Sequence, residues 1–300
     1  MLRAMGPTRS FLRPIDSVFQ ALLSMLVVLG LMGPAAAWAG SERVSVPSLD
    51  RVAGAPVVLV GYWFAAGTGR GPAVVMLHGC GGPYTRQGEL GEREIRYAGL
   101  LNERDVHMLV LDSFSARGEA ELCTQKIGTR RVTQLNRRRD ALGALQWLAQ
   151  RAEVDASRIG LLGFSNGGST VLAATNLAHA EVAANPVRAA FAVAFYPGCE
   201  EEAKRGYRGS GELLVLVGEA DDWTPAAPCK ELAATSPRVA IEAYPGAHHG
   251  FDSMRPVRLR ANVPNGVNPG KGVHVGGDPG AREASQRRLM AFIDLQRLAR

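Results

Sequence analysis

The feature that most constrains the fold is an alternation of short apolar segments with amphipathic ones. Unbroken apolar runs are typical of strands that are covered on both faces of a parallel sheet. Residues 134–150 and 281–298 instead have apolar side chains about one helical turn apart. The alternation predicts βαβ units and a doubly wound α/β sheet, and the Pro- and Gly-rich residues 255–280 predict a long surface loop. The predicted strands are residues 57–64, 73–77, 106–112, 158–163, 189–195, 213–217 and 239–243.

Composition and charge exclude several classes of protein. With 46% apolar and 21% charged residues, the chain is typical of globular proteins rather than of disordered or fibrous ones. Its net charge of +6 is modest, and its densest basic segment contains no interleaved aromatic residues. We interpret that segment as a solvated helix face and expect no nucleic-acid partner. The segment contains Arg130, Arg131, Arg137, Arg138 and Arg139.

Residues 1–39 have the layout of a signal peptide. Three arginines precede a mainly apolar stretch, residues 21–32, and Ala-Trp-Ala at 37–39 offers small residues where signal peptidase reads. The apolar stretch is short for a membrane span, which needs about 20 residues. We expect cleavage after residue 39, which leaves one domain, 40–300, in the periplasm or outside the cell without stable membrane insertion. An uncleaved anchor is the alternative.

The sharpest chemical signal is the segment Gly163-Phe164-Ser165-Asn166-Gly167. It lies between a predicted strand and a helix of small residues, which is the context of a nucleophile elbow. The tight turn strains the backbone at Ser165, and the glycines on either side let strand and helix approach closely. The Ser165 hydroxyl is therefore expected to project beyond the carboxyl ends of the strands as a nucleophile.

A serine nucleophile needs a histidine base and a carboxylate, and in this topology the carboxylate precedes the histidine in the chain. Asp221 and Asp222 follow the sixth predicted strand, and His248 and His249 follow the seventh. Only one residue of each pair can join the nucleophile, and the local sequence leaves both choices open. Adjacent histidines can also bind a metal, but no third ligand at usable spacing is visible, so we expect no metal site.

Acyl transfer also needs N–H donors for the oxyanion. Asn166, the residue after the nucleophile, offers one. The glycine-rich segment His78-Gly79-Cys80-Gly81-Gly82 follows the second predicted strand and offers the other, which we assign to Cys80. No G-K-[ST] follows this segment, so it does not read as a phosphate cradle.

Together these motifs resemble the dienelactone hydrolase family of α/β-hydrolases, from about residue 56 to the last helix. The family's spacing selects Asp221, four residues before Pro225, and His249, two residues before Phe251. The resemblance implies an α/β-hydrolase fold with about eight mostly parallel strands and helices on both faces. It also implies a Ser165–His249–Asp221 triad and no cofactor. The matching features are His78-Gly79, Asp112-Ser113-Phe114, the elbow, the acid loop and the His-x-Phe end.

The chain also departs from dienelactone hydrolase proper, which has a cysteine nucleophile and a glutamate on the oxyanion strand. The equivalents here are Ser165 and Gly79, and Ser253 lies where the family has a carboxylate-binding arginine. Arg117 either matches the family's other substrate arginine or is a solvated loop charge. Trp223 is a further candidate for substrate binding. A general ester is therefore a safer expectation than dienelactone itself.

Export would place the four cysteines in an oxidising compartment, where they allow 3 disulfide connectivities. The layout implied by the resemblance favours Cys80–Cys123 and Cys199–Cys229. In that layout Cys199 and Cys229 follow neighbouring strands, and Cys80 and Cys123 lie in loops over adjacent strands. The first bond would then clamp the oxyanion loop.

We therefore expect an exported serine hydrolase that cleaves a carboxylic ester or lactone of a small substrate through an acyl-enzyme on Ser165. A non-catalytic periplasmic binding protein on the same scaffold is the alternative from another class, because a fold alone does not prove activity. A peptidase or an acyltransferase is the alternative within enzymes. The chain shows no propeller domain and no long lid, which favours small substrates.

Overall fold

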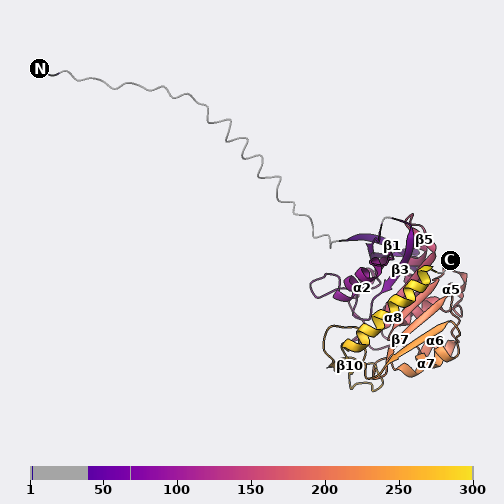
Figure 1. Cartoon of the computed structure of the whole chain (residues 1–300). Helices are drawn as coiled ribbons and strands as arrows, with labels where there is room; N and C mark the ends of the chain where they lie inside the picture. The colour runs from indigo at the N-terminus through magenta and orange to yellow at the C-terminus, as the bar shows by residue number, and fades with distance from the viewer. Residues whose placement is uncertain (1, 3–39, 68, 299–300) are drawn as a thin grey trace. The chain divides into compact units, whose positions relative to one another are not determined.

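The computed structural model describes residues 2, 40–67 and 69–298 (Figure 1). The chain divides into Met1–Ala39 and a compact unit, Gly40–Arg300. The predicted signal segment, 1–39, lies outside the described residues apart from residue 2. Within the described part of the chain, no helix has the length and apolar character needed to cross a bilayer.

An eight-stranded sheet forms the centre of the unit Gly40–Arg300, in the order β1-β2-β4-β3-β5-β6-β7-β8. The pairs β1·β2 and β2·β4 are antiparallel, and every other neighbouring pair is parallel. This confirms the expected mostly parallel sheet of about eight strands. The strands are β1 Ser41–Val52, β2 Ala55–Phe64, β3 Gly71–Leu77, β4 His107–Asp112, β5 Val154–Phe164, β6 Phe191–Phe195, β7 Glu212–Gly218 and β8 Val239–Tyr244.

The predicted apolar segments each form part of a strand of this sheet, and the strands near its centre are covered on both faces. All residues of β3, β4 and β6 are buried. Strand β1 has no continuous apolar run and alternates instead: Val46, Ser48 and Asp50 are buried and the residues between them are exposed. Such alternation is typical of an antiparallel edge strand with one face in water.

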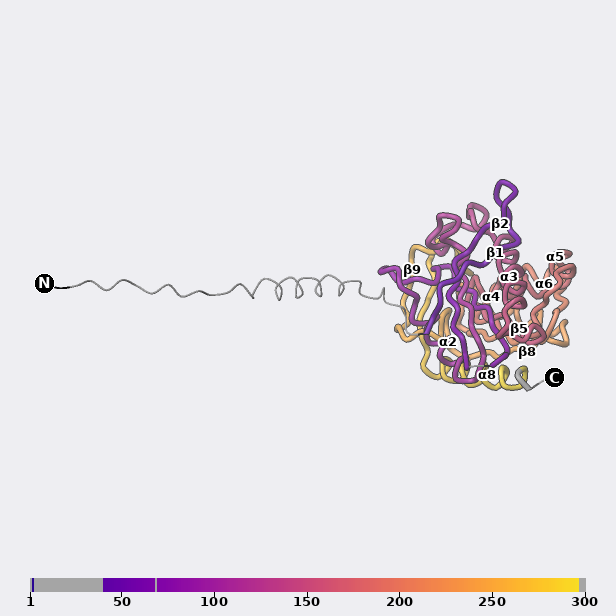
Figure 2. Tube along the Cα trace, turned by 90° about the horizontal axis from the view of Figure 1, so that it is seen from above, coloured from indigo at the N-terminus to yellow at the C-terminus, as the bar shows by residue number. Residues whose placement is uncertain are grey.

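Helices cover both faces of the sheet, as expected for a doubly wound fold. On one face α2 and α8 contribute Tyr97 and Leu289 to one buried cluster, and on the other α3 and α4 contribute Leu145 and Val171 to a second. Seen from above, α2 and α8 lie together, away from α3 and α4 (Figure 2). The helices are α2 Glu92–Asn102, α3 Gln134–Ala149, α4 Asn166–Thr175, α5 Ala180–Ala184, α6 Glu200–Arg205, α7 Ala226–Ala234 and α8 Pro279–Leu298.

The structure corrects the interpretation of the basic segment at Arg137. Its side chain is fully buried; Nη2 donates to the carbonyl oxygen of His78 at 2.8 Å, and Nη1 donates to Asn166 Oδ1. Burial lowers the pKa of Arg137 to about 10, so the guanidinium stays charged at neutral pH. Arg138 and Arg139 remain partly exposed as expected. The expectation was wrong for Arg137 because the charge pattern of a helix does not show which polar atoms of other segments will hydrogen-bond to a buried side chain.

The segment predicted as a long loop, 255–280, contains regular structure. Two short strands, β9 Arg258–Arg260 and β10 Val273–Val275, pair antiparallel and form a hairpin. With three residues each, these strands are too short to produce a recognisable apolar pattern.

Both predicted disulfides are present, and none of the four cysteines is free. Cys80–Cys123 links the loop after β3 to a loop that follows η1 Ser115–Arg117, a single 3₁₀ turn after β4. Cys199–Cys229 links the residue before α6 to α7, within the buried cluster on the α3–α4 side. One bond therefore lies beside the predicted oxyanion loop and the other lies in the core.

Candidate active site

Ser165 occupies a strained turn between β5 and α4. Its φ of 54° and ψ of −118° lie in a region that residues other than glycine rarely adopt. A Cβ at Gly163 would come within 2.2 Å of Gly167 O, and one at Gly167 would come within 2.0 Å of Leu77 O. Both glycines are therefore required by close backbone approach, as the elbow motif predicts.

A continuous chain of hydrogen bonds links Ser165, His249 and Asp221. Ser165 Oγ lies 2.8 Å from His249 Nε2, and His249 Nδ1 lies 2.8 Å from Asp221 Oδ2. His249 and Asp221 are 4% and 5% exposed, so water competes little for these contacts. The serine follows β5, the aspartate follows β7 and the histidine follows β8, and the parallel strands bring the three loops to one edge of the sheet.

The environment of Asp221 keeps its carboxylate ionised. Its Oδ1 accepts hydrogen bonds from the backbone N–H groups of Trp223 at 2.8 Å and Thr224 at 2.9 Å. Burial acts to raise the pKa of Asp221, but the imidazole of His249 and the two N–H donors outweigh it, and the pKa is lowered from 3.8. An ionised carboxylate at this place can orient the imidazole and stabilise its protonated form.

In each adjacent pair, only one residue joins the hydrogen-bond chain. Asp222 instead accepts from the backbone N–H of His274 and lies 2.7 Å from His274 Nδ1. His248 instead donates from Nδ1 to the carbonyl oxygen of Ala220 at 2.8 Å. Asp222, His248 and His274 are themselves close together and are the one group of potential metal ligands among the described residues.

The predicted oxyanion loop, residues 78–82, is held in place by hydrogen bonds of a buried histidine. His78 donates from Nδ1 to Gly79 O at 2.7 Å, and its Nε2 accepts the backbone N–H of Ser113 at 3.2 Å. Burial lowers the pKa of His78 well below 6.5, so this imidazole is neutral and holds one tautomer. The Cys80–Cys123 disulfide holds the loop from its outer end. Asn166 begins α4, so its N–H has no acceptor within the helix.

A cavity of about 240 Å³ opens above these residues. Four of the predicted site residues line it: Ser165, His249, Cys80 and Trp223. A larger hollow of about 580 Å³ lies between α2 and α8, but no serine, cysteine or histidine lines it. The predicted nucleophile and base therefore open onto the smaller cavity.

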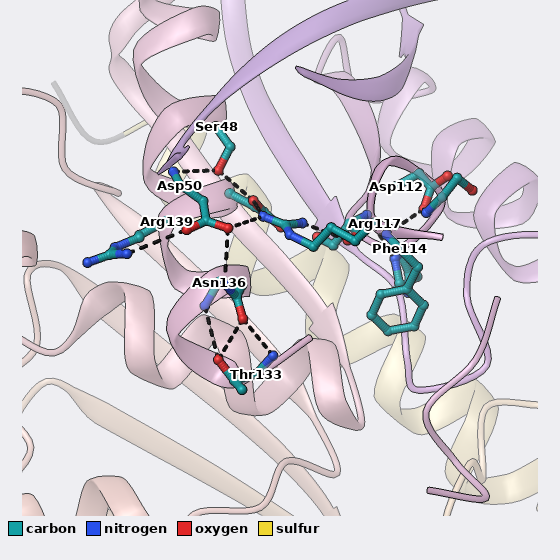
Figure 3. Close-up of polar contacts among 12 residues, drawn as sticks. Ser48, Asp50, Asp112, Phe114, Arg117, Thr133, Asn136 and Arg139 are labelled. Atoms are coloured by element: carbon teal, nitrogen blue, oxygen red, sulfur yellow. Dashed lines mark hydrogen bonds and ion pairs between the residues drawn. The ribbon is translucent and has the colours of Figure 1, made fainter. Parts of the chain in front are cut away.

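Arg117 does not reach this cavity. It forms ion pairs with Asp140 at 2.8 Å and Asp50 at 2.9 Å and donates to Ser113 O, which ties β1 and α3 to the turn after β4 (Figure 3). With its charge neutralised and its side chain 10% exposed, Arg117 has a structural environment rather than that of a substrate contact.

One network beside the triad has no counterpart in the sequence analysis. Arg93 binds Asp252 in a two-point contact, with N···O distances of 2.8 and 2.9 Å, and Tyr196 donates to the same carboxylate at 2.6 Å. The Tyr196 ring lies edge-on to the ring of His249, with centroids 4.7 Å apart. Arg93 lies in α2, and no local sequence signal pairs it with a residue 159 positions away.

The β9–β10 hairpin and the segment that leads into it bring three further arginines to the cavity: Arg255, Arg258 and Arg260. Among residues 40–67 and 69–298, none of the three forms an ion pair. Arg260 lies over the ring of Trp223, 5.7 Å from its centroid, and burial lowers the pKa of Arg260 from 12.5. The hairpin side of the cavity therefore carries positive charge, and the carboxylate of Glu121 acts on Arg260 without forming an ion pair with it.

Comparison with known proteins agrees with this architecture. A model of the dienelactone hydrolase family matches residues 61–263, about two thirds of the chain. A dienelactone hydrolase-like promiscuous phosphotriesterase from metagenomic libraries is 20% identical, with a TM-score of 0.61 over 86% of this chain and 99% of that one. Dienelactone hydrolase from Anabaena variabilis is 17% identical, with a TM-score of 0.58 over 85% and 97%. Esterase 2 of Thermogutta terrifontis is 16% identical, with a TM-score of 0.57 over 87% and 96%. At these identities the solved structures support the fold.

Proposed function

Because this chain belongs to the dienelactone hydrolase family, we propose that it hydrolyses a small carboxylic ester or lactone through an acyl-enzyme on Ser165. The observation that carries the proposal is the chain of hydrogen bonds from Asp221 through His249 to Ser165 Oγ, which ends at a cavity. A nucleophile, a base and an orienting acid within hydrogen-bond reach are the parts that acyl transfer requires.

In the first step, Ser165 Oγ attacks the ester carbonyl carbon while His249 Nε2 takes the hydroxyl proton. The carbonyl π electrons move to oxygen, and the N–H groups of Cys80 and Asn166 stabilise the resulting oxyanion. One such donor typically contributes about 3–4 kcal/mol to the transition state. Asp221 stabilises the imidazolium without taking its proton.

Collapse of this intermediate breaks the bond to the alcohol, which leaves with the proton held by His249. Water then attacks the acyl-enzyme with His249 again acting as base. The carboxylic acid product departs, and Ser165 regains its proton.

The cavity favours a small substrate with an anionic group. Its volume of about 240 Å³ is below the ~300–1,000 Å³ of most drug-sized ligand sites. Arg255, Arg258 and Arg260 form no ion pair with other described residues, and guanidinium groups bind carboxylates through charge-assisted hydrogen bonds. We expect the ester to carry a carboxylate on the side of the molecule that faces the hairpin.

The test compares p-nitrophenyl acetate with the p-nitrophenyl monoester of succinate, which adds a carboxylate. Wild-type protein should hydrolyse both, with a lower KM for the succinate ester, and Ser165→Ala should lose turnover of both. Equal turnover by wild type and Ser165→Ala would refute the proposal. Absence of turnover by wild type across short and charged esters would instead favour the binding-protein alternative.

We further propose that residues 1–39 are a cleaved signal peptide and that the single domain 40–300 works in the periplasm or outside the cell. Two disulfides support this, because such bonds persist in oxidising compartments. Protein isolated from the periplasmic fraction should begin at Gly40. Recovery of the full-length chain in the membrane fraction would support the uncleaved anchor instead.

A further inference from the structure

A second histidine–carboxylate cluster lies directly beside the triad. Asp222 follows β7, His248 follows β8 and His274 lies in β10, so three separate segments contribute. One potential ligand atom of each residue lies within 4.8 Å of those of the other two. The rings of His248 and His274 have centroids 5.3 Å apart. The sequence offers the adjacent pair His248 and His249 no third ligand at usable spacing. In the structure His249 contacts Ser165 and Asp221 instead, and His248 lies beside Asp222 and His274.

A hydrogen bond orients His248 for metal binding, and His274 already lies beside the carboxylate of Asp222. A backbone carbonyl only accepts, so the bond from His248 to Ala220 O puts the proton on Nδ1 and leaves a lone pair on Nε2. His274 Nδ1 lies 2.7 Å from Asp222 Oδ2, so these two atoms can bind one ion in place of the hydrogen bond between them. In the described structure, His248 Nε2 has no hydrogen-bond partner. An Nδ1–H held by a carbonyl or carboxylate, with Nε2 left available, is the arrangement found in metal-binding histidines.

A purely structural role explains only part of this cluster. Asp222 accepts two hydrogen bonds from His274, one from its backbone N–H and one from its ring, which anchors β10 without any ion. That role does not account for His248, which contributes a third ligand atom and makes no hydrogen bond to either of the other two. A purely structural role therefore needs only Asp222 and His274, whereas a metal site also needs His248.

We propose that Asp222, His248 and His274 bind a divalent transition-metal ion of the zinc class. Imidazole with a carboxylate suits zinc, nickel and copper better than calcium or magnesium, which prefer oxygen ligands. Ligand atoms about 2 Å from one ion lie at most about 4 Å apart, so small side-chain rotations complete the site. His274 is exposed, and water fills the remaining coordination position.

Such an ion fastens the hairpin to the loops that carry the triad. The hairpin already makes backbone contacts there: Val267 N–H donates to Asp222 O at 2.9 Å and Gly276 N–H donates to His249 O at 3.0 Å. A metal joining His274 to His248 and Asp222 adds a bond between the same segments. The proposal concerns metal binding alone and holds whether or not the ester hydrolase function does.

The test uses the whole protein as isolated, stripped with EDTA and desalted, and titrates it with zinc sulfate by calorimetry. Wild type should bind one zinc ion per chain, and His248→Gln and His274→Gln should each weaken binding at least tenfold. His179→Gln is the matched control, because His179 also contacts a carboxylate, Glu202, but lies outside the cluster. It should bind zinc as wild type does.

Two further measurements do not depend on the variants. Cobalt(II) added to the stripped wild type should give the visible absorption of a low-symmetry nitrogen–oxygen site, and zinc should abolish it. Zinc should also slow amide hydrogen exchange in residues 258–275. Absence of zinc binding below about 1 mM, or binding that survives both His248→Gln and His274→Gln, would overturn the proposal.

Discussion

The floor and the wall of the cavity are held in place by different means. The floor rests on the sheet and is fixed by the strained elbow, by buried hydrogen bonds and by a disulfide. The wall is the β9–β10 hairpin, whose arginine side chains are exposed or partly exposed. The floor residues are Ser165, Tyr196, His249 and Cys80, and the wall residues are Arg255, Arg258, Arg260 and Val275.

Under the proposed function, the floor carries out catalysis and the wall selects the substrate. Bond breaking needs reacting groups held within about 0.5 Å of a productive geometry, which a packed core provides. Binding of an anionic group needs only positive charge near the cavity, and the exposed arginines of a hairpin can supply that charge. Changes to the floor should therefore alter kcat for every ester, whereas changes to the wall should alter KM for anionic esters only.

The largest effect on activity should come from Asp221→Asn, which removes the buried carboxylate that contacts His249. An amide cannot stabilise the imidazolium, so kcat should fall by about 10³–10⁴-fold for neutral and anionic esters alike. Steady-state kinetics on both p-nitrophenyl esters measures this. Glu219→Gln is the control, because Glu219 lies in the same loop but pairs with exposed Lys230. A fall that is confined to the anionic ester would contradict the separation of floor from wall.

The two disulfides sharpen the comparison, because they close loops of similar length, 43 and 30 residues. Loop-closure entropy assigns each about 4 kcal/mol of stability, so removing either pair should lower the unfolding midpoint comparably. Only the variant Cys80→Ser with Cys123→Ser should also lower kcat, by about 10-fold or more, because it frees an oxyanion donor. The variant Cys199→Ser with Cys229→Ser should keep the wild-type kcat at temperatures where it stays folded. Denaturant unfolding and kinetics on the same samples separate the two effects, and equal kcat losses would contradict the account.

Glu94, the neighbour of Arg93 in α2, is buried, and its burial makes the free energy of unfolding depend on pH. Burial raises the pKa of Glu94 to about 7, above its usual 4.5. The folded state therefore holds the proton more tightly, so this contribution to stability is complete below pH 4.5 and is lost as pH rises through 7. It amounts to about 3 kcal/mol.

Glu94→Gln should remove that dependence. The stability of wild type minus that of the variant should fall by up to about 3 kcal/mol between pH 4.5 and pH 8. Urea unfolding of both proteins at the two pH values measures it, and taking the difference cancels other carboxylates that titrate. A difference that stays constant with pH would show that Glu94 titrates normally.

The smallest effect should come from the wall. Arg258→Gln and Arg260→Gln should each raise KM for the succinate ester about 10-fold, since a hydrogen bond to a charged group contributes about 1.5 kcal/mol. KM for the acetate ester should change little. Arg188→Gln is a suitable control, because Arg188 is exposed and does not line the cavity. Equal KM changes for both esters would assign the hairpin a general rather than a charge-selective role.

The parts of the site that sequence predicts are those with a local cause. Gly163 and Gly167 are required within one turn of Ser165, and continuous apolar runs mark the strands that carry the three loops. Hence the elbow and the order of acid and histidine could be read from the sequence before any coordinates. The choice of Asp221 over Asp222 needed the family's spacing, because both residues follow the same strand.

The remaining parts depend on contacts between distant segments. Arg93 meets Asp252 only after α2 packs beside the loop that follows His249, and Arg137 is buried only because His78 O and Asn166 Oδ1 await it. His274 approaches His248 through a hairpin whose strands are three residues long. No composition or periodicity encodes these pairings, so sequence reasoning either missed them or assigned the residue to solvent.

The most direct test of the central claim is to trap the acyl-enzyme. Wild-type protein is mixed with p-nitrophenyl butyrate, quenched with acid during turnover and digested for peptide mass spectrometry. A butyryl group should appear on the peptide that contains Ser165, and it should be absent from Ser165→Ala. Turnover without acylation of that peptide, or acylation of a different residue with undiminished activity in Ser165→Ala, would contradict it.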